Sequence, residues 1–578
     1  MIRKGFVDLP HGQVHFRYAG RGQPILLLHD SPRSSAMHGA LIEALADEFT
    51  VIALDTPGYG HSSPLPAEPR PEIPDFARAL AATQAALGIE RCAIYGVHTS
   101  SKILLQFALD HPQRVALAII DGLNLPPGGP GDTFIARYMK PLCIEDDGSH
   151  LAAGWSRARE FMRFFPWFDS SPRSRLNQDF PTDEYLHGYA LDLLTAGPHF
   201  SDAYSAAMRY LATPLVSKLH APTVFMCRSN DPLYVFLDSL PAPLPDGCRV
   251  ERLGPERDRW QAFLREQFRS ARSNTTPADS ADLGRTRMAD VATDVAATAV
   301  RRRYREGIQG QWHLREAGGP GGRPIVLLPE SPGSSAGQLP LLAEFATTGR
   351  PVWAPDLPGQ GETSAILRPD GKPPALSDFV DVLLSLLEAK AREPVDLIAP
   401  CSSSPLALAA AARAPERIRS VVCDGVPLLG AALRKQLARL DCPTLTVSRD
   451  GSHLTAMWHQ LRDRELSWPW YERSAAAIRR VTADLAASRM DRMTLDLVRQ
   501  LPHYGALNRA IWTSDYAQLL ATVSQPVLLF KDANDPRLAT SLKARRRLPQ
   551  GQLVKRPDSA AGLLATVGKF WKTIDAAT

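Results

Sequence analysis

The sequence predicts an α/β protein of two tandem domains, each a doubly wound, mostly parallel sheet with a helical insertion. Three observations predict it: the first half of the 578-residue chain recurs in the second, short apolar runs alternate with helical patterns, and an aromatic, helix-rich stretch interrupts each half at the same place. Continuous apolar strands that alternate with helices are typical of parallel sheets covered on both faces.

The internal repeat rests on matched segments with nearly constant spacing. Gly12 matches Gly310, an offset of 298, and Asp231 matches Asp535, an offset of 304. Further matches in the same order join 24–32 to 324–332, 55–60 to 356–361, 111–115 to 414–418, 147–151 to 450–454 and 198–200 to 502–504. A period of about 300 residues is too long for a solenoid, so whole domains are duplicated.

The elements of each repeat follow from its apolar patterns. Strands are expected at 25–28, 51–54, 92–95 and 115–120, with helices at 37–49, 76–87 and 101–111; the second repeat has expected strands at 325–328, 352–354, 395–398, 418–423 and 527–530. The insertions follow a parallel strand, which places them over the carboxyl edge of the sheet, where open α/β sheets bind ligands.

The expected domain boundaries follow from these patterns. The first domain spans 1–270 with a cap at about 122–219, and the second spans 301–578 with a cap at about 425–523. Between them, 271–300 is expected to form a small, polar linker and a helix that runs from Asp290 to Tyr304. The Arg301–Arg303 run is expected to be a solvated helix end, with an anionic-ligand site as the alternative.

Composition excludes several classes of protein. Lys plus Arg is 66 and Asp plus Glu is 61, so the net charge is only +5, which argues against a nucleic-acid binder. The seven cysteines form no CxxC pair, and no apolar run reaches the roughly 18 residues of a membrane span. No signal peptide, metal-ligand spacing, phosphate loop or dinucleotide fingerprint is evident. We therefore expect a cytoplasmic protein without cofactor, metal or membrane partner.

Four motifs carry a resemblance to a known family: the His29 loop before Ser31-Pro32, the Asp-x-Pro-Gly-x-Gly turn at 55–60, the strand–turn–helix at 95–101, and Asn-Asp-Pro at 230–232. With these motifs each repeat resembles a capped α/β-hydrolase-fold domain. The resemblance implies a nucleophile at the centre of Gly-x-Ser-x-Gly, an acid after a late strand, matched by Asp231 and Asp535, and a base after the last strand.

The sequence departs from this pattern in both repeats. The elbow reads Gly96-Val97-His98-Thr99-Ser100 in the first and Ala399-Pro400-Cys401-Ser402-Ser403 in the second, so neither has serine at the apex. No histidine lies in the segments after the last strand, 252–257 and 555–559. The usual triad is therefore incomplete in both halves.

The expected oxyanion region is also unusual. The residue that follows the early-loop histidine position is Asp30 in the first repeat and Glu330 in the second, beside the elbow residues Thr99 and Ser402. A carboxylate would raise the energy of a developing oxyanion, unless it is protonated or turned away. This disfavours ordinary ester hydrolysis more than acid–base chemistry.

His98 is the first candidate for the missing chemistry. Its place at a helix N-terminus disfavours the charged ring, so we expect a neutral imidazole that acts as base or nucleophile. Asp121, at the end of the next strand, or Asp231 would orient it. The alternative is a histidine that only fills the elbow.

Cys401 and two cap histidines are further candidates. At the same helix end Cys401 would gain thiolate character, with a small buried thiol as the alternative. His150, in Asp-Gly-Ser-His-Leu, and His199, in Pro-His-Phe, recur in the second repeat and would supply an imidazole or only structure the cap. Cap aromatics such as Trp155 would line a substrate pocket or form the core of the cap.

These features predict a cofactor-free enzyme that hydrolyses a small carbonyl or ester-like compound at His98. The alternatives are a pseudoenzyme or ligand-binding protein, and a lyase or cofactor-free oxygenase on the same fold. The first repeat is expected to be active because it keeps Gly96, His29 and Tyr59, whereas the second has Ala399 and Pro329. The second is expected to pair with it inside the chain as a degenerate partner, and a homo-oligomer stays open.

Overall fold

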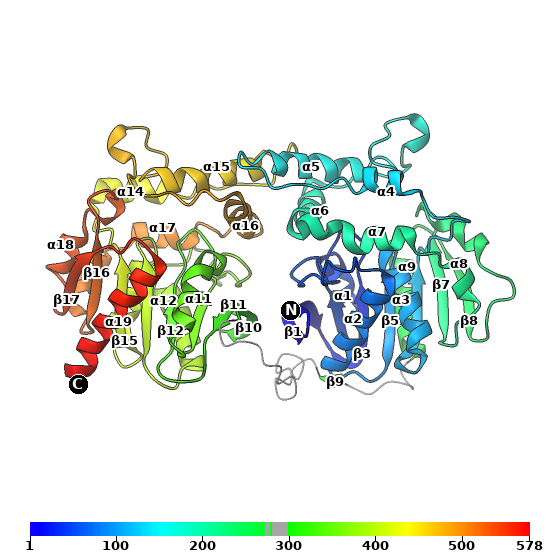
Figure 1. Ribbon diagram of the computed structural model, residues 1–578, viewed down its shortest axis with the longest axis horizontal. Helices are drawn as coiled ribbons and strands as arrows, with labels where there is room; N and C mark the ends of the chain where they lie inside the picture. Colours follow the sequence, from blue (N-terminus) through cyan, green and yellow to red (C-terminus); the bar gives the residue numbers. More distant parts are fainter. Residues whose placement is uncertain (272–277, 280–298, 578) are drawn as a thin grey trace. The chain divides into compact units, whose positions relative to one another are not determined.

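The computed structural model describes residues 1–271, 278–279 and 299–577. They form two compact units (Figure 1). The first unit holds the residues up to Cys143 and the described residues from Ala153 to residue 279. The second unit holds Ile144–Ala152 and the chain from residue 299 onward. The expected linker at 271–300 lies largely outside the described residues. Within it, strand β9 (Ala278–Asp279) pairs antiparallel with Arg21 and Gly22.

The first unit is built on a mostly parallel sheet with the order β1-β2-β4-β3-β5-β6-β7-β8. Its strands are β1 (Arg3–Leu9), β2 (Gly12–Ala19), β3 (Arg21–Leu28), β4 (Phe49–Leu54), β5 (Cys92–Val97), β6 (Val115–Asp121), β7 (Thr223–Arg228) and β8 (Cys248–Leu253). The β1–β2 and β2–β4 pairs are antiparallel, and every pair from β4 to β8 is parallel. The predicted doubly wound sheet is confirmed.

Helices cover this sheet and form the insertion after β6. They are α1 (Gly39–Leu45), α2 (Ile73–Ala86), α3 (Thr99–Asp110), α4 (Asp132–Tyr138), α5 (Ser149–Phe161), α6 (Asp183–Ala196), α7 (Asp202–Arg209), α8 (Thr213–Val216) and α9 (Arg257–Ser270). The central strands are apolar and buried throughout, as a sheet covered on both faces requires. Figure 1 shows α6 and α7 lying beyond one end of the strands.

The second unit repeats this architecture with the strand order β10-β11-β13-β12-β14-β15-β16-β17. Its strands are β10 (Arg301–Gly307), β11 (Gly310–Ala317), β12 (Ile325–Leu327), β13 (Val352–Pro355), β14 (Val395–Pro400), β15 (Ile418–Asp424), β16 (Val527–Lys531) and β17 (Gly551–Lys555). Its helices are α11 (Leu339–Ala346), α12 (Leu376–Lys390), α13 (Ser404–Arg413), α14 (Ala431–Leu440), α15 (Ser452–Leu466), α16 (Ala487–Val498), α17 (Ala506–Thr513), α18 (Ser541–Arg545) and α19 (Ala560–Ala577).

The helix predicted from Asp290 to Tyr304 is wrong for the residues of that segment that the structure describes. Residues 301–307 form β10, whose register pairs Arg303 with Leu314 and Tyr304 with His313. Arg303 and Tyr304 are buried. The Arg301–Arg303 run is therefore part of a strand and not a solvated helix end; the Ala- and Arg-rich composition suggested helix propensity, but the tertiary pairing with β11 outweighs it.

The aromatic side chains of the first cap pack mainly on one another. Tyr138, which is 2% exposed, has ring centroids of Phe134, Phe161 and Phe165 within 5.8 Å. Trp155 is also 2% exposed, on α5. These contacts favour the interpretation of the aromatics as the core of the cap.

Candidate functional site

The elbow of the first repeat keeps the sharp turn that its sequence predicts. His98, between β5 and α3, has φ 51° and ψ −111°, and it is the only non-glycine residue of the described ranges with positive φ. Two glycines make room for it: a Cβ on Gly96 would lie 2.7 Å from the Ser100 carbonyl oxygen, and one on Gly122 would lie 2.6 Å from the His98 ring. A side chain in this region costs about 1–3 kcal/mol, so the surroundings enforce the turn.

Two carboxylates hold the imidazole of His98. The Nε2 atom lies 2.8 Å from Oδ2 of Asp231, and Nδ1 lies 3.3 Å from Oδ2 of Asp30. The strand order places β3, β5 and β7 in one parallel stretch of the sheet, so the loops after them meet at one edge. The side chains of His98, Asp30 and Asp231 are 29%, 25% and 13% exposed, so the cluster is partly accessible to solvent.

The electrostatics of the cluster oppose the expectation of a neutral imidazole. Burial lowers the pKa of His98, but Asp231 and Asp30 together raise it well above the ordinary value. The helix end acts only through partial charges, whereas two full negative charges lie within hydrogen-bond reach. This shift favours the imidazolium form, in which both N–H groups donate to the two carboxylates.

Asp30 occupies the place where the resemblance implies an oxyanion site. Its Oδ1 accepts from the backbone N–H of Ser31 at 2.7 Å and lies 3.5 Å from the backbone N of Thr99. His29 supports the loop, because its Nε2 accepts from Thr56 N at 2.8 Å and its Nδ1 therefore donates to the Asp30 carbonyl at 2.8 Å. A carboxylate thus lies beside the elbow amide.

Asp121 contributes differently from the expectation. Its carboxylate accepts from the Tyr95 hydroxyl at 2.6 Å, and only its backbone carbonyl meets His98, by accepting from His98 N at 3.0 Å. Burial raises the pKa of Asp121, and the nearby Asp231 adds to this. The carboxylate that orients the imidazole through Nε2 is that of Asp231, the other partner that the sequence offered.

The cap histidines have partners of their own outside the His98 cluster. His150 belongs to the second unit, where its Nε2 lies 2.9 Å from Oδ1 of Asp491 and its ring packs on Trp458. His199 lies beside the turn at Gly58, and its Nδ1 is 2.9 Å from Oδ2 of Asp202. Neither has a hydrogen bond to His98, Asp30 or Asp231 among those found in the described chain.

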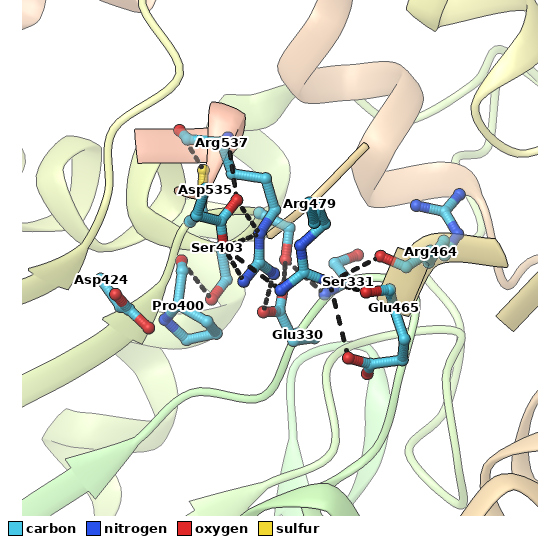
Figure 2. A network of polar contacts seen from close by, with 12 residues as sticks. Glu330, Ser331, Pro400, Ser403, Asp424, Arg464, Glu465, Arg479, Asp535 and Arg537 are labelled. Carbon is cyan, nitrogen blue, oxygen red and sulfur yellow. Dashed lines mark hydrogen bonds and ion pairs between the residues drawn. The ribbon is translucent and has the colours of Figure 1, made fainter. Parts of the chain in front are cut away.

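The second repeat has a different cation between its two carboxylates. Arg537 Nη1 donates to Oε1 of Glu330 at 3.1 Å, and Nη2 donates to Oδ2 of Asp535 at 2.7 Å (Figure 2). Arg479, only 4% exposed, adds a contact of 3.2 Å to Asp535. Glu330 also accepts from the Ser402 hydroxyl, which donates where the Thr99 amide does in the first repeat.

Cys401 has the environment of a buried thiol rather than a nucleophile. It is 4% exposed, and its Sγ lies 3.4 Å from the Arg537 carbonyl oxygen. Burial raises the pKa of the thiol far above its ordinary range, although Arg537 opposes this. Cys401 is also absent from the described residues with positive φ, so the strained turn of the first repeat is relaxed here.

Two contacts near the candidate sites are not predicted by the sequence. Arg537 follows Asn534-Asp535-Pro536, where the first repeat has Leu233, and this difference within a matched motif was the available signal. The ion pair of Arg33 with Asp192 joins residues 159 positions apart, and no local pattern indicates such a contact.

Comparison with known proteins agrees with this architecture. The model of the α/β hydrolase fold family matches residues 23–141 and 323–561, more than half of the chain, one stretch in each repeat. The chain belongs to this family.

Its relatives include hydrolases of several kinds. The chain is 34% identical to a fluoroacetate dehalogenase of Burkholderia sp over 125 residues, 21% of this chain and 41% of the relative. It is 29% identical to a 2-hydroxy-6-oxo-6-phenylhexa-2,4-dienoate hydrolase of Comamonas testosteroni over 145 residues, 24% of this chain and 46% of the relative. The chain thus spans less than half the length of these relatives. An epoxide hydrolase structure from an endophytic Streptomyces is 20% identical, with a TM-score of 0.38, over 47% of this chain and 96% of the other.

Among the described residues, no helix has both the length and the apolar character that crossing a membrane requires. No group of three or more His, Cys, Asp or Glu side chains there has an arrangement suited to a metal ion.

Proposed function

We propose that the first repeat is a cofactor-free enzyme of the hydrolase superfamily that acts on a small carbonyl or ester-like compound, with His98 as its acid–base group. One observation carries this proposal. His98 is held in a strained turn while both of its ring nitrogens contact carboxylates from two other loops. Backbone strain of this kind clusters at functional sites, and a structural histidine has no need of it.

The charges of the cluster suggest an order of proton transfers. The resting ring is an imidazolium held at Nε2 by Asp231, so His98 begins as the acid. Asp30 is the more exposed carboxylate and serves as the base. As Asp30 takes a proton from the attacking water, His98 gives the Nδ1 proton to the carbonyl oxygen, so that no oxyanion builds up beside Asp30.

Collapse of the intermediate restores the cluster. The hydroxyl proton of the tetrahedral centre returns to Nδ1 of His98, and the protonated Asp30 gives its proton to the departing oxygen or carbon. Each group thus ends with the protons it started with. This cycle needs neither a serine nucleophile nor a histidine after the last strand.

The second repeat cannot carry out the same cycle of proton transfers. A guanidinium retains its protons at every pH at which proteins are stable, so Arg537 pairs with Glu330 and Asp535 without exchanging a proton. Burial raises the pKa of Cys401 and so disfavours a thiolate there. We propose that the chemistry is confined to the first repeat.

A binding protein without turnover is the second candidate. The observation in its favour is Asp30, whose Oδ1 lies at the Thr99 amide and so covers a donor that an ordinary hydrolase would offer to the oxyanion. Such a protein would bind the ligand equally well with or without the acid–base group.

The test is steady-state turnover of a panel of aryl esters and C–C diketones by the wild type and by His98→Gln, His98→Ala and Cys401→Ala. We expect a loss of about 10²–10⁴-fold with both His98 variants and wild-type rates with Cys401→Ala. Turnover that survives both His98 substitutions contradicts the proposal. Ligand binding without turnover, unchanged in His98→Ala, favours the binding protein, and mass analysis of the products separates hydrolysis from lyase or oxygenase chemistry.

A further inference from the structure

A buried arginine joins the loop of Asp30 to the cap in the first repeat. The Arg33 side chain is 8% exposed, its Nε donates to Oδ2 of Asp192 on α6 at 2.9 Å, and its Nη1 donates to the Tyr185 hydroxyl at 2.9 Å. The guanidinium also lies 5.0 Å from the ring centroids of both Tyr185 and Tyr189. Ser34 completes the clamp by donating to Oδ1 of Asp192 at 2.6 Å.

This clamp lies three residues from the catalytic carboxylate. The backbone N–H of Arg33 donates to the Asp30 carbonyl at 2.9 Å, so the two residues form one tight turn. Burial and then the negative charge of Asp30 raise the pKa of the Tyr189 phenol. The Asp30 contact with Nδ1 of His98 is the longer of the two at the imidazole, 3.3 Å, and a small shift of the loop would break it.

The second repeat provides an internal comparison. Ser334 and Asp496 keep the hydroxyl–carboxylate bond at 2.6 Å, but Gly333 stands where the first repeat has Arg33. There the loop carboxylate, Glu330, is held by Arg537 instead. The arginine clamp is thus present only in the repeat whose loop carboxylate faces an imidazole.

We infer that Arg33 is a positioning residue of the first repeat, which holds the Asp30 carboxylate against Nδ1 of His98 by tying the loop to α6 through Asp192. The inference rests on the proposed function. Its physical basis is the planar fork of the guanidinium, which bonds the carboxylate and the tyrosine hydroxyl together and stacks on two rings, whereas a lysine ammonium has neither geometry.

The test compares Arg33→Lys and Asp192→Asn with the matched control Asp496→Asn in the full chain. The first readout is the titration of His98, followed by NMR of the protein with labelled histidine and assigned by the signal that His98→Gln removes. Asp30→Asn serves as the reference for complete loss of the Asp30 contact. Asp231, Asp121 and Arg228, the other charged groups near the ring, stay in place in every variant.

We expect the pKa of His98 to fall toward its ordinary value in Arg33→Lys and Asp192→Asn, in the direction of Asp30→Asn, and to stay unchanged in Asp496→Asn. On any substrate that the wild type turns over, kcat should fall by about tenfold or more with little change in KM, because the base is misplaced. An unchanged His98 titration in folded Arg33→Lys and Asp192→Asn overturns the inference and leaves only a structural clamp. Absence of turnover in the wild type would count against the proposed function alone, since the titration is read without a substrate.

Discussion

Replacing Asp55 by asparagine should destabilise the first unit strongly. Asp55, 1% exposed at the end of β4, accepts from His15 Nδ1 at 2.8 Å, from His61 N at 2.9 Å and from Ser35 N at 2.7 Å. The two backbone donors face different carboxylate oxygens, so either orientation of an asparagine amide sets an NH₂ group against an N–H group. The His15 ring can change tautomer, but the backbone cannot.

The magnitude follows from these contacts. An orphaned buried N–H costs about 1–3 kcal/mol, and breaking a buried charged pair costs about 3–5 kcal/mol in total. At about 2–4 °C per kcal/mol for a domain of this size class, the Tm should fall by about 6–20 °C. The duplicated chain supplies a matched variant, Asp356→Asn, because Asp356 has the same three contacts at 2.8, 2.9 and 2.7 Å.

The assay is calorimetry of the two full-length variants as a function of pH. Burial raises the pKa of Asp55, but its interactions with His15, His29 and Arg17 outweigh this and hold the pKa well below its ordinary value. This stabilisation is therefore present above the unfolded value of about 3.9 and is lost as the pH falls through the folded pKa. The difference between wild type and Asp55→Asn should accordingly shrink in acid. A Tm change below about 2 °C in both variants at neutral pH refutes the reasoning.

Three further predictions concern the two sites. The His98 ring should titrate well above pH 6.5, so its contribution to stability is complete below that pH and is lost as the pH rises through the folded pKa; a ring that is neutral at pH 7 by NMR would contradict this. In the folded protein a disulfide-containing reagent that labels thiols should modify exposed Cys143 before buried Cys401. Cys143→Ser should therefore remove the fast phase of labelling. A fast phase that depends on Cys401 would instead mean that Cys401 is a reactive thiol. Arg537→Met should destabilise the second unit by about 2–4 kcal/mol in urea unfolding, because Glu330 and Asp535 lose their shared partner; wild-type stability would show that the ion pairs contribute nothing net.

The sequence predicted the sheet well because its signals are local and repeated. Apolar runs such as 115–120 are long enough to mark a strand without knowledge of its neighbours, and β6 spans Val115–Asp121. The helix expected up to Tyr304 failed because propensity ignores the pairing with β11. A local apolar pattern therefore predicts an element when the burial of that segment decides its structure. The pattern fails when pairing with a distant strand decides the structure.

The position of the candidate site was predictable from the sequence, but the charge of the His98 ring was not. The elbow motif and the topology placed His98, Asp30 and Asp231 at one edge of the sheet. The protonation of His98 depends on two carboxylates, at 2.8 and 3.3 Å from its nitrogens, and spacing in the sequence does not give such distances. The Arg33–Asp192 contact was unpredictable for the same reason.

Because the two sites hold different cations, their charges respond differently to a rise in pH. Once the pH exceeds the pKa of His98, the first site retains two carboxylates and a neutral ring, so no cation offsets the repulsion between Asp30 and Asp231. The second site keeps its guanidinium between Glu330 and Asp535 throughout the same range. The duplicated sites therefore differ in one respect: the charge of the first depends on whether His98 is protonated, whereas the guanidinium of the second keeps its charge.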